Sequence, residues 1–143
     1  MPWMWIHPTL QLAGLLLGLY ALYLGWRRFA FAHLGRKVIF LWKRHVALGS
    51  TVMAIWLAGL LLGLGMAWWA WGVVLITGLH HQTALLMVPL LGFGYFSGLV
   101  MHRRKAKRKV LPLAHAVNNL LLVLLTLSQL ATGAVIVRDY LLP

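Results

Sequence analysis

The sequence predicts an all-α integral membrane protein, a four-helix transmembrane bundle with both termini outside the cytoplasm. Of its 143 residues, 62% are apolar and 10% are charged, and the mean hydropathy of +0.86 is too high for a soluble domain of this size. A helix needs about 20 apolar residues to cross the hydrocarbon core of a bilayer. The chain therefore has room for four spans with short connections, in a single membrane domain over residues 1–143.

The first half of the chain contains two of the expected spans, residues 6–26 and 45–66. A basic stretch from Arg27 to Arg44 separates them and predicts an interfacial connection, partly an amphipathic helix, that does not span. No charged residue occurs from Val46 to Leu79, a run too long for one upright helix. We therefore expect the second span to end near Met66, with the tryptophans that follow it at the interface.

The second half contains the other two expected spans, residues 80–101 and 113–137. The basic cluster from Arg103 to Lys109 ends the third span, and Pro112 suits the first turn of the fourth. Lipid offers no hydrogen-bond partners to the backbone, and the sequence shows no alternating strand pattern. All four spans are therefore expected to be helices.

The distribution of lysine and arginine predicts the orientation of the bundle. Twelve of the 13 basic residues fall in the first and third connections, and only Arg138 lies on the other side. By the positive-inside rule, both connections are cytoplasmic and both termini are periplasmic in a bacterial inner membrane, although a thylakoid membrane is the open alternative. The first span lacks a basic leader and is too long for a signal peptide, so residue 1 onward is interpreted as mature protein.

The net charge of +12 raises the alternative of a nucleic-acid-binding protein, since the segment from Arg103 to Lys109 resembles a basic tail. Topology explains the same charges, because basic residues confined to one side of a membrane protein follow from the positive-inside rule. Attraction to anionic lipid headgroups adds to this. We expect membrane lipid as a partner and no nucleic acid.

Four histidines, His7, His45, His80 and His115, stand at or near the starts of the four apolar segments. Antiparallel connection places the starts of the first and third helices at the outer surface and those of the second and fourth at the inner surface. In a sequentially wound bundle each of these two pairs is diagonal and faces across the core. Neutral imidazole is a good ligand for iron, so the pattern predicts two six-coordinate haems stacked across the membrane.

Residues near these histidines extend the predicted sites. Gly14 and Gly49 provide room for a flat cofactor, while Lys43 and Arg44 are candidates to pair with the haem propionates at the inner site. The chain has no cysteine, so a haem is held without thioether bonds. Gln11 and Asn119, each four residues after a proposed ligand, are candidate contacts to the ligand histidine or the haem edge.

The remaining three histidines are weaker candidates for haem ligands. His81 is the reserve ligand of the third helix, although its helical face carries larger residues than that of His80. His33 and His102 lie in or beside the basic connections and are interpreted as solvated. A single histidine at a helix end is equally well explained as an interfacial hydrogen-bonding group, but four in two depth-matched pairs favour ligands.

Four short motifs resemble the helix starts of the cytochrome b561 superfamily, in particular a small four-helix di-haem membrane cytochrome b branch. They are I-H-P-T-L-Q-L-A-G (6–14), R-H-V-A-L-G (44–49), G-L-H-H (78–81) and L-A-H-A-V-N-N (113–119). The resemblance implies two non-covalent haem b groups, with His7 and His80 as outer ligands and His45 and His115 as inner ligands. The chain lacks the flanking helices of the six-helix members that use ascorbate.

The expected function is transmembrane electron transfer, between a quinol or quinone pool or a redox partner subunit and an acceptor on the other side. The chain is expected to be a subunit of a larger redox complex or a homo-oligomer, and its status as an enzyme stays open. The first alternative is a haem-free structural or assembly subunit of a larger membrane complex. The second is a cytochrome b anchor of a dehydrogenase or hydrogenase.

Overall fold

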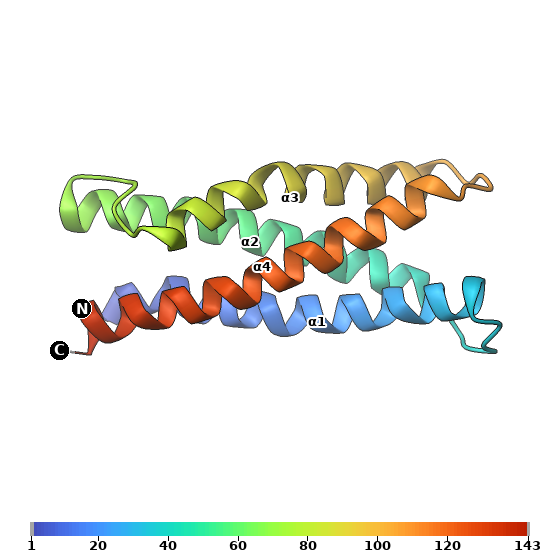
Figure 1. The fold of residues 1–143 in the computed structure, drawn as a ribbon, viewed down its shortest axis with the longest axis horizontal. Coiled ribbons are helices and arrows are strands. Elements are labelled where there is room, and N and C mark those ends of the chain that lie inside the picture. Colours follow the sequence, from blue (N-terminus) through green and yellow to red (C-terminus); the bar gives the residue numbers. More distant parts are fainter. Residues whose placement is uncertain (1, 143) are drawn as a thin grey trace.

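The computed structural model describes residues 2–142 and is helical along nearly all of its length (Figure 1). In chain order the elements are η1 (Pro2–Trp5), α1 (Ile6–His33), α2 (Trp42–Trp71), α3 (Leu79–Arg103) and α4 (Val110–Leu141). No strand occurs among the described residues. Each of the four α-helices is long and apolar enough to cross a membrane. The prediction of an all-α chain with four helices long and apolar enough to span a membrane is confirmed.

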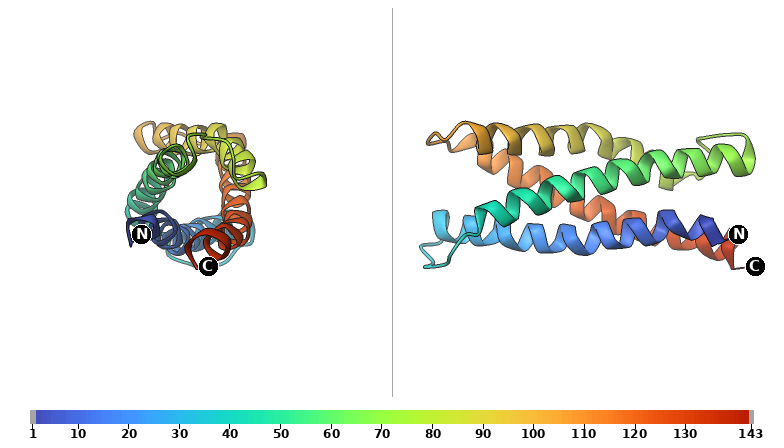
Figure 2. Two further views of the ribbon diagram at one scale, coloured as in Figure 1. Left: turned by 90° about the vertical axis from the view of Figure 1, so that its left-hand side faces the viewer. Right: turned by 180° about the vertical axis from the view of Figure 1, so that it is seen from behind.

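The helices form an antiparallel bundle in which chain neighbours are also neighbours in space. α1 packs against α2 and α4, and α3 packs against the same two helices. Seen along the bundle axis, the four helices form a ring in chain order (Figure 2). α1 is therefore diagonal to α3, and α2 is diagonal to α4, which is the winding that the histidine pairing requires.

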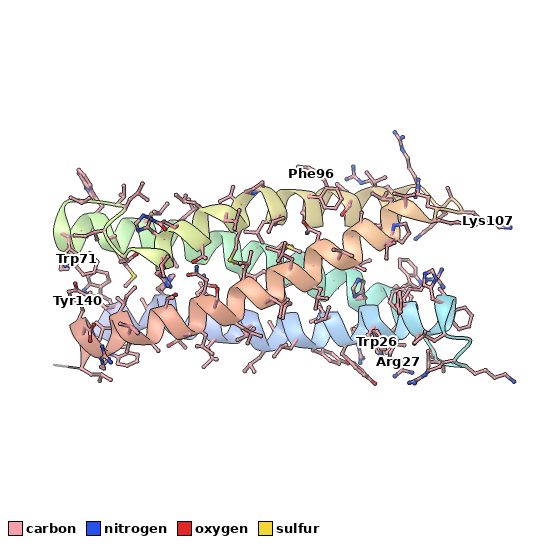
Figure 3. The ribbon with its side chains drawn as sticks, viewed as in Figure 1. Trp26, Arg27, Trp71, Phe96, Lys107 and Tyr140 are labelled. Carbon is pink, nitrogen blue, oxygen red and sulfur yellow. The ribbon has the colours of Figure 1, made fainter. Side chains whose placement is uncertain are left out.

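The two ends of the bundle differ in chemistry. One end, here called the terminal end, holds both chain termini and the α2–α3 connection (Figure 1). Trp71 lies against Tyr140 there, with ring centroids 5.0 Å apart. The other end, here called the basic end, holds the connections 34–41 and 104–109, and Figure 3 shows Arg27 and Lys107 at it. Aromatic residues also lie at the basic end, where Trp26 is beside Arg27, so the two ends differ mainly in their basic residues, as the charge pattern of the sequence predicts.

The helices are longer than the predicted spans. α1 continues through Arg27 and Arg28 to His33, so the first connection covers only residues 34–41. α2 begins at Trp42 and continues five residues beyond Met66, to Trp71. Bilayer thickness limits the apolar part of a helix and not the helix itself, because lysine, arginine and tryptophan side chains at its ends reach the interface.

Two glycines shape the connection between α2 and α3. Gly72 ends α2 with φ of +67°, and its N–H donates to the Trp68 carbonyl at 2.8 Å. Gly78, with φ of +57°, directly precedes α3. Both have a positive φ that side chains with a Cβ rarely adopt, so the chain reverses within residues 72–78.

The core of the bundle is a small cluster of side chains midway between its ends. Its buried members are Val52, Trp56, Met87, Leu91, Leu122 and Val123. Large apolar side chains cover the outside of every helix and are exposed, as expected for surfaces that face lipid. Few polar side chains lie in the interior of the bundle, and the four helix-start histidines are prominent among them.

Candidate functional site

His7 and His80 meet at the terminal end of the bundle. His7 lies in the first turn of α1 and His80 in the first turn of the diagonal helix α3. Their ring centroids are 6.2 Å apart and the ring planes are nearly perpendicular, at 77°. Both side chains are half-buried. The structure thus brings together the two residues that the sequence assigns to one pair.

His45 and His115 form an equivalent pair at the basic end. They lie near the starts of α2 and α4, which are also diagonal. Their ring centroids are 6.4 Å apart, with an interplanar angle of 76°. The two pairs therefore share one geometry, although their residues come from different helices.

Hydrogen bonds fix the tautomers of two histidines, one in each pair. His7 Nδ1 lies 2.9 Å from the Gly59 carbonyl, and His45 Nδ1 lies 3.0 Å from the Ala21 carbonyl. A carbonyl only accepts, so the hydrogen of each ring is on Nδ1. The Nε2 of each neutral ring consequently keeps its lone pair free for a metal ion.

The other two histidines donate to hydroxyl groups. His80 Nδ1 lies 3.0 Å from Thr132 Oγ1, and that hydroxyl donates its own hydrogen to the Ser128 carbonyl. His115 Nδ1 lies 2.8 Å from Ser97 Oγ. Ser97 likewise donates its hydroxyl hydrogen to a carbonyl of its own helix, that of Phe93. Each hydroxyl is thus an acceptor for Nδ1–H, and all four histidines adopt the same tautomer.

An amide group caps one of these Nε2 atoms. Asn119 Nδ2 donates to His115 Nε2 at 2.9 Å, and Asn118 Nδ2 in turn lies 3.3 Å from Asn119 Oδ1. The bond requires an unprotonated Nε2 and agrees with the tautomer that Ser97 imposes. Asn119 therefore contacts the histidine four residues before it, as the spacing suggested.

Each histidine ring also rests on a glycine of a neighbouring helix. His7 and His45 pack on Gly63 and Gly25 across the α1–α2 contact, and His80 and His115 pack on Gly133 and Gly98 across the α3–α4 contact. A Cβ at any of these glycines would lie 3.0–3.3 Å from the Cε1 atom of the ring. Spacing along the sequence did not reveal these four glycines, because each lies on a different helix from the histidine that it contacts.

The predicted glycines lie elsewhere. A Cβ on Gly14 would be 2.8 Å from Ile55 Cγ2 and 3.0 Å from Trp56 Nε1, so this glycine faces the middle of α2. Gly49 has open space around it, which leaves its predicted role as room for a cofactor a prediction. Gln11 packs against Gly59, the residue whose carbonyl accepts from His7.

The two predicted propionate partners lie at the basic end, directly before His45. Lys43 and Arg44 are exposed, and Arg44 Nη1 donates to the Tyr20 hydroxyl at 3.3 Å. At the terminal end, Arg138 is paired with Asp139 at 2.7 Å. Cationic side chains are thus more available beside His45–His115 than beside His7–His80.

The remaining histidines do not form such pairs. His81 is next to His80, and its buried Nδ1 has no hydrogen-bond partner among the described residues. His33 is exposed and stacks on Phe29. His102 is half-buried against Trp42, with ring centroids 5.5 Å apart, and is therefore less solvated than its place in the sequence suggested.

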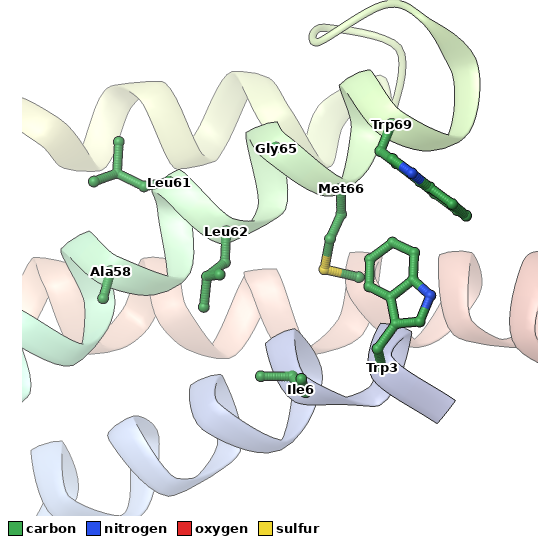
Figure 4. Close-up of a pocket in the computed structure, with 8 residues that line it drawn as sticks. All are labelled: Trp3, Ile6, Ala58, Leu61, Leu62, Gly65, Met66 and Trp69. Carbon is green, nitrogen blue, oxygen red and sulfur yellow. The ribbon is translucent and has the colours of Figure 1, made fainter. Parts of the chain in front are cut away.

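A cavity of about 570 Å³ surrounds the His7–His80 pair. All four helices contribute to its walls, which are mainly apolar, and Trp56 and Met87 lie on the side toward the middle of the bundle. A second hollow, of about 700 Å³, lies between the start of α1 and the end of α2 (Figure 4). Trp3, Met66 and Trp69 line it, and no histidine does. Of these two cavities, only the first contains predicted ligands.

No cluster of three or more histidine, cysteine, aspartate or glutamate side chains that could hold a bare metal ion occurs within residues 2–142. A tetrapyrrole supplies four ligands of its own, so it requires only two from the protein. Comparison of the chain with known protein families, curated proteins and solved structures found no match. The resemblance to the cytochrome b561 superfamily therefore stays a prediction.

Proposed function

We propose that the chain transfers single electrons across a membrane through two non-covalent haem b groups, one between His7 and His80 and one between His45 and His115. The observation that carries this proposal is the spacing of the rings. Two imidazoles on opposite sides of one metal ion, with metal–nitrogen bonds of about 2.0 Å and about 1.1 Å from each nitrogen to its ring centre, have centroids roughly 6.2 Å apart. The two pairs have centroid distances of 6.2 and 6.4 Å.

The hydrogen bonds of the four histidines support the same proposal. A histidine that binds a metal through one nitrogen typically donates its other N–H to a carbonyl or a similar acceptor, which fixes the ring orientation and raises its basicity. All four rings have an acceptor for Nδ1–H and an unprotonated Nε2 that could bind a metal, although the Nε2 of His115 accepts a hydrogen bond from Asn119. The glycines under the rings hold each imidazole close to the neighbouring helix.

The haem and the protein side chains would have different roles in each site. A bound haem supplies the redox-active iron, which accepts and releases one electron. The four histidines would hold the two haems, and the hydrogen-bond partners of Nδ1 orient the rings and leave Nε2 unprotonated. Lys43 and Arg44 provide cationic groups for carboxylates at the basic end, while Arg138 at the terminal end is already paired with Asp139.

The charge pattern extends the proposal to orientation and partners. The basic end is proposed to be cytoplasmic and the terminal end periplasmic in a bacterial inner membrane, by the positive-inside rule. The loops are too short to contain another redox domain. Electrons are therefore proposed to come from, or pass to, a quinone in the membrane, a partner subunit of a larger redox complex or a second copy of the chain.

The deciding experiment is a reduced-minus-oxidised absorption spectrum of the purified protein, with quantification of haem per chain. The proposal expects a bis-histidine b-type spectrum and two haems per chain. A protein purified from haem-replete cells without such a spectrum would refute it and favour the haem-free structural subunit.

Histidine variants test the pairing. His45→Ala and His115→Ala should each remove the same haem and leave the other, while His33→Ala, as the matched control, keeps both. Loss of different haems in the two variants, or of both haems in each, contradicts the pairing.

A further inference from the structure

The bundle consists of two equivalent helical hairpins, α1–α2 and α3–α4. Seventy-three residues separate His7 from His80 and also Gly25 from Gly98. Seventy residues separate His45 from His115 and also Gly63 from Gly133. Each hairpin therefore supplies one histidine to each pair and one glycine beneath each of its own histidines.

Many of the buried residues follow the same offsets. Gly14, Gly18, Ala21 and Leu24 of α1 correspond to Met87, Leu91, Gly94 and Ser97 of α3, and all eight are buried. Val52 and Trp56 of α2 correspond to Leu122 and Thr126 of α4, which are also buried. Other buried residues, such as Leu15 and Val123, have counterparts that are not buried. At the positions that do repeat, a difference in side-chain size marks a place where the two halves differ.

The largest departure is at Trp56. Its counterpart, Thr126, is small, and its hydroxyl donates to the Leu122 carbonyl of its own helix at 2.8 Å. The indole of Trp56 instead lies on Gly14 and Gly18, where a Cβ would come within 3.0 and 2.9 Å of the ring. The repeat places the larger Met87 and Leu91 at those two positions of the other hairpin, so the space under the indole is particular to α1.

Trp56 also occupies a special place along the bundle axis. It lies eleven residues after His45 and seven before Gly63, which contacts His7. At about 1.5 Å per residue, these separations are about 16 Å and about 10 Å along α2. Trp56 is therefore between the two histidine pairs, nearer to His7–His80, and it lines the cavity around that pair.

The nitrogen of this indole has no partner among residues 2–142. Trp56 is 4% exposed, and its Nε1 is buried without a hydrogen-bond acceptor in that part of the chain. Buried N–H groups are paired in the great majority of cases, so an unpaired one beside a cavity indicates an acceptor within it. An aromatic ring is such an acceptor when no oxygen is present.

We propose that Trp56 is a bridging residue between the two redox sites: its N–H donates to the tetrapyrrole held by His7 and His80, and its indole couples that site to His45–His115. This inference rests on the proposed function. One electron leaves the reduced site and enters the oxidised one, while Trp56 itself is neither oxidised nor reduced. Its N–H dipole, with the positive end toward the cavity, stabilises the added electron there and raises the midpoint potential of that site.

The test is a redox titration of the purified holoprotein, with wild type, Trp56→Phe and Trp68→Phe compared. Trp56→Phe retains an aromatic ring but loses the N–H, and it should lower the midpoint potential of one haem while the other is unchanged. Trp68→Phe, the same substitution at an exposed residue outside both cavities, is the matched control and should change neither potential. Trp56→Leu should in addition slow electron transfer between the haems after rapid reduction of one of them.

A second variant covers the case in which Trp56→Phe loses haem. Gly18→Ala keeps Trp56 but displaces the indole, since the new Cβ would lie 2.9 Å from its Cζ2 atom, and it should shift the same single potential. Unchanged potentials in Gly18→Ala and Trp56→Phe proteins that bind both haems would overturn the inference, as would equal shifts of both. A wild-type protein without haem would refute the proposed function instead, so the two failures are distinguishable.

Discussion

Thr132→Val removes a single hydrogen-bond acceptor from one candidate ligand and leaves the shape of the side chain nearly unchanged. The hydroxyl of Thr132 accepts from His80 Nδ1 at 3.0 Å and donates to the Ser128 carbonyl within α4. Loss of the bond from the Thr132 hydroxyl to the Ser128 carbonyl should not disturb α4, because the helix is held by its backbone hydrogen bonds. The substitution therefore acts mainly on His80, whose Nδ1–H loses the acceptor that orients the ring.

The expected magnitude follows from the burial of His80. A buried donor left without a partner costs about 1–3 kcal/mol, and His80 is half-buried, so about 1–2 kcal/mol applies here. At about 1.4 kcal/mol per tenfold change, haem affinity at the His7–His80 site should fall about 5- to 30-fold. This range overlaps the loss of about 10- to 100-fold that is typical when the hydrogen-bond partner of a metal-binding histidine is removed.

The assay is a haem titration of the apoprotein, followed by absorbance, in a His45→Ala background in which only the His7–His80 site binds. Thr126→Val in the same background is the control, because Thr126 lines the same cavity but its hydroxyl donates to a carbonyl of its own helix and not to a histidine. Equal haem affinities of the Thr132→Val protein and its parent would refute the role of the hydroxyl. An equal loss in the Thr126→Val control would show that the bundle as a whole had loosened.

Three further substitutions test other parts of the sites. Gly63→Ala should weaken haem binding at His7–His80, because its Cβ would lie 3.0 Å from His7 Cε1; an unchanged haem titration would contradict the packing. Asn119→Ala should strengthen haem binding at His45–His115 by about 2- to 10-fold, since the bond from Asn119 to His115 Nε2 must break before coordination and is worth about 0.5–1.5 kcal/mol; weaker binding would mean that the amide contacts the cofactor instead. His81→Ala should leave two haems per chain in the spectrum, whereas loss of one would make His81 the ligand of α3.

The sequence was sufficient to predict which histidines meet. The basic connections indicated at which membrane surface each helix starts. In a sequentially wound bundle, two helices that start at the same surface are diagonal to each other, so His7 was assigned to His80 and His45 to His115 before any contact was known. Hydrophobic length alone could not define the helix ends. α1 and α2 extend beyond the apolar spans because their terminal side chains reach the interface.

The glycines beneath the histidines could not be found by helical spacing. Gly63 and His7 are 56 residues apart, and they meet only because α1 and α2 are antiparallel neighbours. Gly14 is on α1 itself, about two turns from His7, and this distance along the axis brings it to the level of Trp56 and away from the ring. The internal repeat of the sequence could have revealed these glycines, because a shift of 70–73 residues places histidine on histidine and glycine on glycine.

The two hairpins hold their histidines by different means. His7 and His45, both in the first hairpin, donate to backbone carbonyls, whereas His80 and His115, in the second, donate to the hydroxyls of Thr132 and Ser97. A carbonyl within a helix cannot be removed by a substitution, but a hydroxyl can. Each proposed haem would thus be held by one histidine that the main chain orients and by one histidine whose basicity depends on a replaceable side chain. Because ligand basicity is one of the properties through which a protein sets redox potential, Ser97 and Thr132 are where the potentials of the two sites can be changed independently.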